Sequence, residues 1–227
     1  MEITLSKRLE TVARFVPTGA RIADIGSDHA YLPIFLVSKG QVTTAIAGEV
    51  VQGPYDSALQ NVRDANLSSH IDVRLANGLE AVQVIDQINT VTIAGMGGRL
   101  IAEILEAGKD KLATVERLIL QPNNREDDVR RWLQKHEFRL IDEAILEENG
   151  KIYEVIVAEP GQMQLSESEE RFGPYLLRHI SPIFVKKWTK ELAKLESALE
   201  QIPLERGGQR LILSQKIKSI QEVIHVS

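Results

Sequence analysis

"ADIGSDHAYLP", residues 23–33, is the stretch that decides the fold, because an apolar run ends in it and a helical pattern begins. The run that reaches Gly26 has the continuous apolar character of a strand buried in a parallel sheet. In dinucleotide-binding turns further glycines follow such a strand, and here Asp28 and Ala30 stand in their places. The stretch therefore reads as a modified nucleotide-binding turn, and the chemistry of its side chains has to be explained.

Apolar, β-branched runs alternate with helical patterns from about residue 20 to residue 122, as is typical of βαβ units around a parallel sheet. Five parallel strands are predicted, in the runs "RIADIG", "VTTAIAGE", "IDVRLA", "TVTIAGM" and "RLILQP". Pro33 and Pro54 lie where first helical turns are expected, so we expect helices to separate the strands. A short amphipathic helix ahead of the first strand is predicted from apolar residues at helical spacing: Leu5, Leu9, Val12 and Phe15.

The pattern changes after residue 137, where two strand-like runs are joined at "EENGK". Asn-Gly at such a junction is a strong hairpin signal. Five parallel strands followed by an antiparallel hairpin match the organisation of class I methyltransferases. We therefore expect an α/β fold, with a Rossmann-like class I methyltransferase sheet in a domain of residues 1–160.

Residues 161–227 are predicted to form a second domain, a C-terminal helical coiled-coil hairpin. Ser181 is the expected N-cap and Pro182 the first residue of its first long helix. Two apolar stripes at helical spacing are expected to pack against each other: Leu192, Leu195, Leu199 and Ile202, and then Leu213, Ile217, Ile220 and Ile224.

The composition, 227 residues of which 43% are hydrophobic and 26% charged, suits a globular protein with one full domain core and a smaller appendage. No stretch approaches the roughly 20 apolar residues of a membrane span, and "MEITLSKRLE" lacks an apolar signal core. We expect a cytoplasmic protein with no membrane partner. Because the chain has no cysteine, disulfides, thiolate zinc sites and cysteine nucleophiles are excluded, and we expect no metal.

The net charge of −5 does not indicate nucleic-acid binding by the molecule as a whole. The charge is unevenly distributed along the chain. Residues 161–227 contain ten Lys and Arg residues and eight Asp and Glu residues, a balance of +2, which leaves −7 on residues 1–160. A basic surface must therefore be local, and the C-terminal part is the more basic one.

Ligands of open α/β sheets lie across the carboxyl ends of the strands, so the residues after each run are the candidates for a cofactor site. After the first strand, Asp24 and Gly26 flank the turn, where a plain strand-to-helix turn is the alternative. Glu49 follows the second strand at the distance expected for an acid that holds ribose hydroxyls, or else it helps to cap the helix at Pro54. After the third strand, Asn77 and Gly78 could address an adenine edge or form a simple turn.

The segment "AGMGG", residues 94–98, follows the fourth strand and lacks the Asn-Pro-Pro-aromatic and Pro-Cys elements with which many nucleobase methyltransferases hold their target. Its glycines Gly95, Gly97 and Gly98 permit close backbone approach, although a tight turn needs one of them at most. Met96 is suited to pack against an adenine or a sulfonium group. The fifth strand is followed by Gln121 and Asn123, where Asn123 or its neighbour Asn124 could instead cap the next helix.

Together these segments resemble one family, the bacterial tRNA (adenine-22-N1)-methyltransferases of the TrmK type. The resemblance rests on "DIGSDHAYLP", "GEVVQGPYDSA", "ANGLEAV", "IAGMGGRLI" and "LILQPN", and it runs from "LSKRLETVA" through the helical tail. It implies S-adenosyl-L-methionine as cofactor, tRNA as substrate, a Rossmann-like N-terminal domain and a C-terminal coiled coil. Against the general class I pattern, the first turn departs at Asp28 and Ala30.

This reaction gives the unusual turn a purpose. N1 of adenine carries a free lone pair, so its methylation needs no strong general base, and positive charge develops on the base. Asp28 is the candidate acceptor near the exocyclic amine, Tyr31 could stack on the extruded base, and His29 could contact a phosphate or the base edge. Asn123 completes the predicted catalytic set. The alternative places Asp28 as a helix cap and Tyr31 in the core.

Cationic side chains on helices are the candidate tRNA contacts, although charged runs on helices are more often merely solvated. The predicted RNA-binding residues are Arg8, Lys186, Lys190, Arg206 and Arg210.

We expect a monomer or a weak dimer. Two other function classes stay open: an NAD-dependent oxidoreductase, disfavoured by the missing glycines and the terminal hairpin, and an RNA-binding protein without catalysis. A methyltransferase that acts on another RNA is a further alternative.

Overall fold

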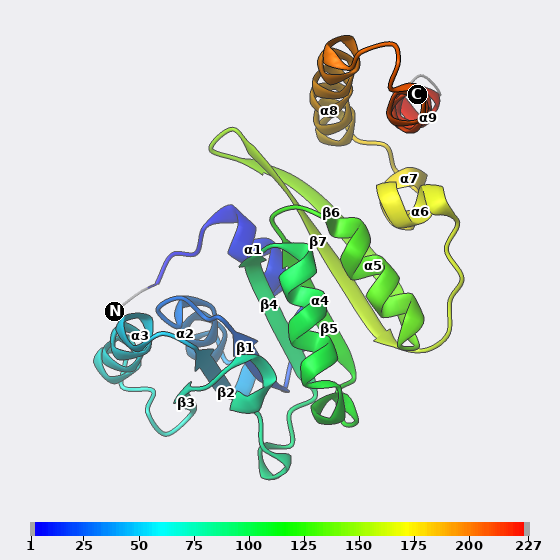
Figure 1. Ribbon diagram of the computed structural model, residues 1–227. Helices are drawn as coiled ribbons and strands as arrows, with labels where there is room; N and C mark the ends of the chain where they lie inside the picture. Colours follow the sequence, from blue (N-terminus) through cyan, green and yellow to red (C-terminus); the bar gives the residue numbers. More distant parts are fainter. Residues whose placement is uncertain (1–2, 225–227) are drawn as a thin grey trace. The chain divides into compact units, whose positions relative to one another are not determined.

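The computed structural model describes residues 3–224, which contain a seven-stranded sheet (Figure 1). The strand order is β3-β2-β1-β4-β5-β7-β6, in which the first five strands are parallel and β7 runs antiparallel to β5. The parallel strands are β1 (Ala20–Ile25), β2 (Val42–Glu49), β3 (Ile71–Leu75), β4 (Thr90–Met96) and β5 (Arg117–Pro122). The predicted α/β class, with five parallel strands and a terminal hairpin, is confirmed.

Helices cover the parallel strands in two groups (Figure 1). The first group is α1 (Lys7–Phe15), α2 (Tyr31–Ser38) and α3 (Gln52–Asp64), and the second is α4 (Gly98–Ala107) and α5 (Glu126–Lys135). The predicted helix ahead of the sheet is α1, and Ser6 begins it by accepting a hydrogen bond from the backbone N–H of Leu9 at 3.2 Å. Pro33 and Pro54 lie in the first turns of α2 and α3, as predicted.

The connection between β3 and β4 differs from the expectation that a helix separates each pair of strands. It consists of two short 3-10 helices, η1 (Gly78–Ala81) and η2 (Val84–Asp86). Gly78 takes a left-handed φ of 55° and Val82, the C-cap residue of η1, is extended, so η1 ends after four residues instead of continuing into a longer helix. A third 3-10 helix, η3 (Lys109–Leu112), follows α4.

The hairpin consists of β6 (Phe138–Glu148) and β7 (Lys151–Pro160), joined by Asn149 and Gly150. Both turn residues have positive φ, 51° and 75°. Positive φ at both central positions is the requirement of a type I′ turn, whose twist matches that of antiparallel strands. The Asn-Gly signal therefore predicted this turn correctly.

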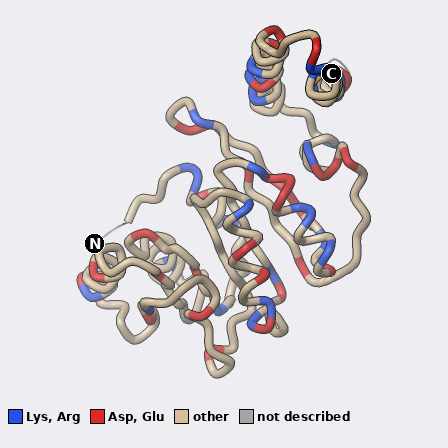
Figure 2. Tube along the Cα trace, viewed as in Figure 1, with Lys and Arg blue, Asp and Glu red and all other residues tan. Residues whose placement is uncertain are grey.

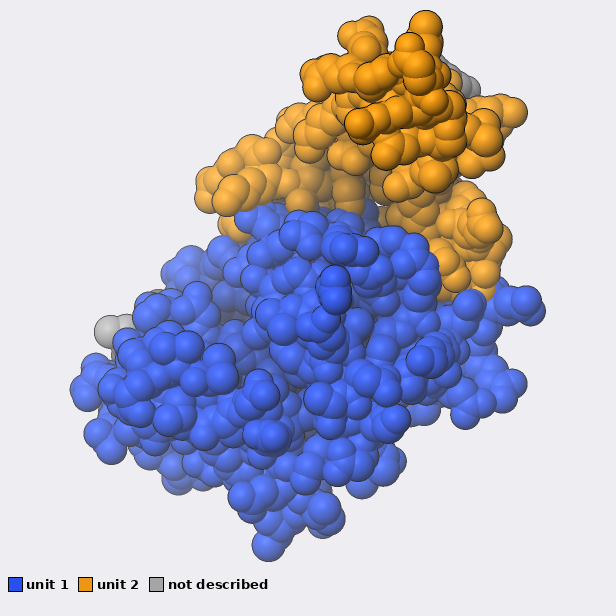
Figure 3. All heavy atoms as spheres, viewed as in Figure 1, with its two compact units in different colours: residues 1–144, 153–164 blue, residues 145–152, 165–227 orange. Residues whose placement is uncertain are grey.

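The chain divides into two compact units, coloured in Figure 3. Unit 1 contains residues 3–144 and 153–164 of the described chain, and so holds the parallel sheet with its helices. Unit 2 contains residues 145–152, the tip of the hairpin, and residues 165–224. Its helices are α6 (Glu167–Phe172), α7 (Pro174–Arg178), α8 (Pro182–Gln201) and α9 (Gly207–Ile224).

The core of unit 2 is mostly aromatic. Phe172, Phe184 and Trp188 pack with Leu176 and Ile220, and the ring centroids of Phe172 and Trp188 are 4.5 Å apart in an edge-on arrangement. Helices α8 and α9 contact each other. Of the two predicted apolar stripes, however, Ile217 and Ile220 are buried while the other members are half-buried. The reason is that the first turns of α8 and the short helix α6 supply the large rings that fill this core.

A buried ion-pair network joins α5 to the hairpin within unit 1. Arg130 is fully buried, and its Nε lies 2.7 Å from Glu143 on β6 while its Nη2 lies 2.6 Å from Glu154 on β7. Burial lowers the pKa of Arg130, but the two carboxylates outweigh this effect, so its pKa lies above the ordinary value and the charge is retained. The network holds the two hairpin strands against the helix that follows β5.

Replacing Arg130 by methionine should lower the free energy of unfolding by about 3 to 5 kcal/mol, because it leaves buried carboxylates without their cation. Equilibrium urea unfolding measures the change. The matched control is Arg131→Met, since Arg131 is half-exposed and pairs with Asp127 and Asp128 at the surface. That control should cost less than about 1 kcal/mol, and equal losses in the two variants would contradict this account of the network.

Candidate active site

The carboxyl ends of the five parallel strands lie along one edge of the sheet, in the order β3, β2, β1, β4, β5. Every cofactor-site and catalytic residue predicted from the sequence falls at this edge or in the turn that follows a strand there: Asp24, Gly26, Asp28, His29, Tyr31, Glu49, Asn77, Gly78, Gly95, Met96, Gly97 and Asn123. The sheet topology thus brings together residues that are up to a hundred positions apart in the chain. This edge is the candidate active site.

The turn after β1 has an unusual backbone. Gly26 has a φ of 69°, and Asp28, His29 and Ala30 follow with φ of 44°, 71° and 59°. Residues that carry a side chain rarely adopt this left-handed backbone conformation, and each one that does costs on the order of 1 kcal/mol of strain or more. The turn therefore keeps a backbone suited to glycine while it carries an acid and an imidazole. Such strain persists only where contacts with the surrounding structure hold the backbone in place.

Four hydrogen bonds with neighbouring elements hold the strained turn. The backbone N–H groups of Gly26 and Ser27 donate to the carbonyl of Gly48 in β2 at 2.9 and 3.2 Å, and the N–H of Asp28 donates to the carboxylate of Glu49 at 2.5 Å. On the other side, the amide of Asn61 in α3 donates to the carbonyl of His29 at 3.0 Å. Asn61 carries no signal of this role in the sequence, because its partner is a backbone atom 32 positions away.

The predicted trio Asp28, His29 and Tyr31 lies together at the surface. His29 Nε2 is 3.3 Å from the Asp28 carboxylate, and the rings of His29 and Tyr31 are 5.5 Å apart. The alternative roles do not hold, because α2 begins at Tyr31 with Ala30 at its N-cap position and Tyr31 is 40% exposed. The Asp28 side chain is 83% exposed and so is accessible to a ligand.

Asp24 is buried beneath this turn. One of its carboxylate oxygens accepts a hydrogen bond from the Ser27 hydroxyl and the other from the Thr92 hydroxyl, both at 2.6 Å. Burial raises the pKa of Asp24, while these hydroxyls and the positive charge of Arg8 lower it in part. Both supporting hydroxyls were missed in the sequence. A threonine between the apolar residues Val91 and Ile93 was the available signal for Thr92.

Glu49 ends β2 and is also buried, with 6% of its surface exposed. Burial raises its pKa, the hydrogen bond from Asp28 N–H lowers it, and the negative charges of Asp24 and Asp28 raise it again. The alternative role as a helix cap does not apply, since Val51 occupies the N-cap position of α3. Glu49 thus lies between two neighbouring strand ends, with a carboxylate that can accept further hydrogen bonds.

The glycines at the end of β4 and after it have different roles. Gly95 has a φ of 83°, which favours glycine. At Gly98 a Cβ would lie 2.1 Å from the carbonyl oxygen of Arg125, so this glycine allows the loop after β5 to pack on α4. Met96 packs on the first turn, because a Cβ on Gly26 would lie 2.1 Å from its methyl carbon. Gly97 is the N-cap residue of α4.

The end of β5 contributes a buried and an exposed amide. Gln121 is fully buried, whereas Asn123 is exposed and its Nδ2 donates to the carbonyl of Gly95 at 2.7 Å. Arg125, and not Asn123 or Asn124, occupies the N-cap position of α5. The capping alternative therefore does not hold, and the side chain of Asn123 lies beside the β4 turn.

The outer part of the edge is apolar. At the end of β3, Asn77 is exposed and Gly78 packs closely on Ile104 of α4. Exposed large apolar side chains belong to the segments around the edge: Val50 (65%), Val51 (57%), Leu75 (48%) and Leu100 (48%). Sequence reasoning missed them, because a valine or leucine after a strand carries no signal of its own. Such side chains suit the faces of a planar, largely apolar ring.

The predicted RNA-binding cations differ in their surroundings, and Figure 2 shows basic residues along α8. In unit 2, Lys186 pairs with Glu147 at 2.7 Å, and Lys190 and Arg206 are exposed. Arg210 donates to the carbonyls of Leu199 and Ile202 at 2.8 and 2.7 Å, so it caps the end of α8. In unit 1, Arg8 lies at the strand ends, where it donates to Gln121 at 2.6 Å.

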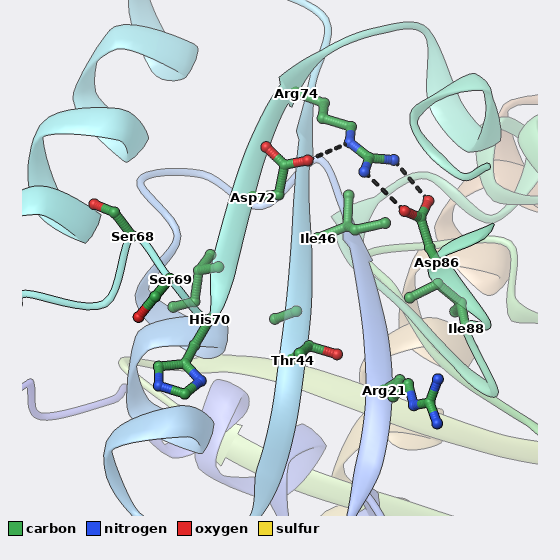
Figure 4. Close-up of a pocket in the computed structure, with 12 residues that line it drawn as sticks. Arg21, Thr44, Ile46, Ser68, Ser69, His70, Asp72, Arg74, Asp86 and Ile88 are labelled. Carbon is green, nitrogen blue, oxygen red and sulfur yellow. Dashed lines mark hydrogen bonds and ion pairs between the residues drawn. The ribbon is translucent and has the colours of Figure 1, made fainter.

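A cavity of about 350 Å³ lies elsewhere on the sheet (Figure 4). Its lining includes Arg21, Thr44 and His70, from the amino-terminal parts of β1 and β2 and the residue before β3. Figure 4 shows Arg74 held between two carboxylates, with Asp86 at 2.6 and 2.8 Å and Asp72 at 2.7 Å. Arg74, Asp72 and Asp86 are therefore structural ion pairs, and the lining of this cavity contains none of the candidate site residues.

Two further findings concern the described chain. Within residues 3–224, no group of three or more His, Cys, Asp and Glu side chains is arranged to hold a metal ion. Across the same part of the chain, none of the helices has both the length and the apolar character required to cross a membrane.

Comparison with known proteins gives consistent results. Residues 22–226 match the family model described as tRNA (adenine(22)-N(1))-methyltransferase. The chain is 48% identical to the tRNA (adenine(22)-N(1))-methyltransferase of Bacillus subtilis strain 168, over 98% of each chain.

Solved structures resemble the chain over nearly its whole length. One is a putative tRNA (m1A22) methyltransferase of Streptococcus pneumoniae in complex with S-adenosyl-L-methionine, with 60% identity, a TM-score of 0.93 and coverage of 98% of this chain and 100% of that one. Another is a relative from M. capricolum in complex with the cofactor product S-adenosyl-homocysteine, with 30% identity, a TM-score of 0.88 and coverage of 98% of both chains.

The packing at Gly98 predicts opposite effects for two glycine substitutions in first helical turns. Gly98→Ala should lower the free energy of unfolding by about 1 to 3 kcal/mol, because the rigid backbone of Arg125 has to move. The control Gly53→Ala, at a position of α3 with open space around it, should be neutral or stabilising by up to about 1 kcal/mol through helix propensity. Urea unfolding measures both. A neutral Gly98→Ala would show that the loop after β5 is not held in this way.

Proposed function

The chain belongs to the tRNA (adenine(22)-N(1))-methyltransferase family, and on this basis we propose that it uses S-adenosyl-L-methionine to methylate N1 of adenine 22 in tRNA. The observation that carries the proposal is the turn after β1, which presents Asp28, His29 and Tyr31 beside a buried acid, Glu49. We also propose that the protein acts in the cytoplasm, where its tRNA substrate is found.

The side chains at the strand ends fit S-adenosyl-L-methionine, which supplies an electrophilic methyl group on its sulfonium centre. The carboxylate of Glu49 suits ribose hydroxyls, since it can accept two further hydrogen bonds beside that from Asp28. Gly26 and Met96 form a narrow contact in which an added side chain would collide. The remaining proposed cofactor contacts are Asp24, Asn77, Gly78, Gly95 and Gly97.

Asp24 has a supporting role in this proposal. Both of its oxygens already accept hydroxyl hydrogen bonds, so it stabilises the turn. Burial raises the pKa of Asp24, and a nearby cation, such as the ammonium group of an amino-acid moiety, would oppose that rise by favouring the ionised carboxylate. The second effect of Asp24 is to fix Ser27, the residue that precedes the catalytic turn.

The methyl transfer itself requires orientation and charge stabilisation more than proton removal. N1 of adenine attacks with its free lone pair, and the positive charge that develops spreads to the exocyclic amine. The exposed carboxylate of Asp28 is proposed to accept a hydrogen bond from that amine, an interaction that strengthens as the charge develops. The contact of His29 with Asp28 orients the carboxylate.

Two further side chains are proposed to hold the target base. Tyr31 is 40% exposed beside His29, so its ring is available to stack on a base that has left the RNA helix. Asn123 is exposed at the end of β5, and its hydrogen bond to Gly95 fixes the direction of its amide. A fixed amide can donate to or accept from the base edge without first losing side-chain freedom.

Unit 2 is proposed to supply a second contact with tRNA. Residues 1–160 carry −7 and on balance repel a polyanion, whereas residues 161–227 carry +2. The proposed contacts in unit 2 are Lys186, Lys190, Arg206 and Arg210. Lys190 is the clearest of them because it is exposed on the long helix α8, whereas Arg210 also caps that helix.

Nucleoside mass spectrometry of tRNA incubated with the protein and S-adenosyl-L-methionine tests the proposed function. We expect 1-methyladenosine at position 22, and its absence with a folded protein would contradict the proposal.

In single turnover, Asp28→Asn should reduce the rate on the order of 10²-fold, because the charge is lost while the backbone N–H to Glu49 and the left-handed backbone are retained. Calorimetry should show cofactor binding unchanged within a few-fold. The control, Asp110→Asn on η3, should leave the rate unchanged.

Charge reversal on α8 tests the proposed tRNA contact of unit 2. Lys190→Glu should weaken tRNA binding, and it should make the dependence of log Kd on log salt concentration shallower by about 1 if a phosphate contact is lost. The control Lys111→Glu changes the net charge equally but lies on η3 in unit 1. Equal weakening in the two variants would show a general charge effect and no contact at Lys190.

A further inference from the structure

Arg8 takes part in a hydrogen-bond network that ends at the proposed catalytic edge. Its Nη1 donates to Oε1 of Gln121 at 2.6 Å, and the backbone N–H of Gly95 donates to the same oxygen at 3.0 Å. These two donors fix the orientation of the Gln121 amide, because both require its oxygen on their side. Gln121 is fully buried, so it is not accessible to RNA.

The other end of the Gln121 amide orients Asn123. Gln121 Nε2 donates to Oδ1 of Asn123 at 3.2 Å and to the carbonyl of Pro122 at 2.9 Å. Asn123 in turn donates from Nδ2 to the carbonyl of Gly95 at 2.7 Å. The peptide groups of Gly95 are therefore held at the N–H by Gln121 and at the carbonyl by Asn123.

The guanidinium of Arg8 also packs against the end of β4. A Cβ on Gly95 would lie 3.4 Å from Arg8 Nη1, and Gly95 has a positive φ of 83°. The next residue, Met96, covers Gly26 with its methyl group. Arg8 further lies 5.7 Å from the ring centroid of Tyr153, and its positive charge lowers the pKa of the buried Asp24 carboxyl. All of these interactions are within unit 1.

We propose that Arg8 is a positioning residue, which acts through the buried amide of Gln121 to fix Asn123 and the end of β4 at Gly95 and Met96. This inference rests on the proposed function for its effect on catalysis. It gives Arg8 a role different from the tRNA contact expected from the sequence. A positioning residue lowers the rate at saturation, whereas an RNA contact mainly lowers the affinity for tRNA.

Kinetic comparison of Arg8→Leu, Gln121→Leu and the double variant tests the proposal. Arg8→Leu should lower kcat on the order of 10- to 100-fold, with tRNA Kd and its salt dependence little changed, because a small misplacement of reacting groups is costly. Gln121→Leu should have a similar effect, and the double variant should be far from additive, since the two residues act in one network. The matched control Arg14→Leu removes an exposed arginine from the same helix and should be neutral.

The opposite kinetic result would overturn the proposal. If Arg8→Leu weakens tRNA binding with a shallower salt dependence and leaves kcat unchanged, Arg8 is an RNA contact. Additive effects of two folded single variants would likewise contradict the network. If Gln121→Leu does not fold, Arg8→Leu alone decides the question through its kinetics and the measurement that follows.

A second measurement is independent of activity. The methyl resonance of Met96, one of three methionines, can be observed by NMR after 13C-methyl labelling. It should shift in Arg8→Leu and Gln121→Leu but not in Arg14→Leu, in the protein alone. An unchanged resonance in Arg8→Leu would overturn the inference even if the enzyme is active. An inactive wild-type protein that shows the expected shifts would instead contradict the proposed function and leave the positioning role intact.

Discussion

The hydrogen bond from Asp28 N–H to the carboxylate of Glu49, 2.5 Å long, is the interaction on which the candidate site depends. It joins the turn after β1 to the end of β2. It therefore connects Asp28, the proposed hydrogen-bond acceptor for the target base, to Glu49, the proposed ribose-binding residue. Three consecutive side-chain-bearing residues with positive φ follow Ser27, and such a turn persists only where its surroundings hold it. Because hydrogen bonds hold this strained turn, a backbone suited to glycine can carry Asp28 and His29. This explains why the sequence lacks the expected glycines.

The same design recurs beneath the site, where buried polar groups are satisfied by partners from other elements. Asp24 accepts from Ser27 and Thr92, and Gln121 accepts from Arg8 and Gly95. Unpaired, each of these buried groups would cost roughly 1 to 3 kcal/mol. Paired, they fix the turns after β1, β4 and β5, so the exposed side chains above them have defined directions before a ligand binds. Pre-organisation of this kind suits a transfer that needs orientation more than acid-base chemistry.

The two compact units have different physical characters. Unit 1 combines an acidic composition with a well-supported strand edge, whereas unit 2 has an aromatic core beneath a helix, α8, with exposed and paired lysines. A small cofactor and one base require only the first kind of surface. A folded tRNA presents a wide phosphate surface, and the more basic unit is the one suited to meet it.

The sequence by itself determined the parallel strands, the helix at residues 7–15, the Asn-Gly hairpin and the set of residues at the strand ends. These features depend on local periodicity, on turn chemistry and on the rule that parallel strands end at one edge. The absence of a longer helix between β3 and β4 escaped it, as did the small share of the predicted stripes in the core of unit 2. Both depend on packing between distant segments.

The roles of individual side chains were decided by the tertiary structure. The sequence predicts Arg8 as an RNA contact because it is a cation that lies off the apolar stripe of its helix, yet its guanidinium lies against Gln121, 113 positions away. The sequence identified Gly98 as a site of close backbone approach, and the structure shows that the approaching group is the backbone of Arg125. Arg130, Glu143 and Glu154 carry no signal of burial in the sequence, and the structure joins them in a buried network. Periodicity reports which face of an element is apolar, but the partner of a polar group is set by contacts that form only when the sheet has assembled.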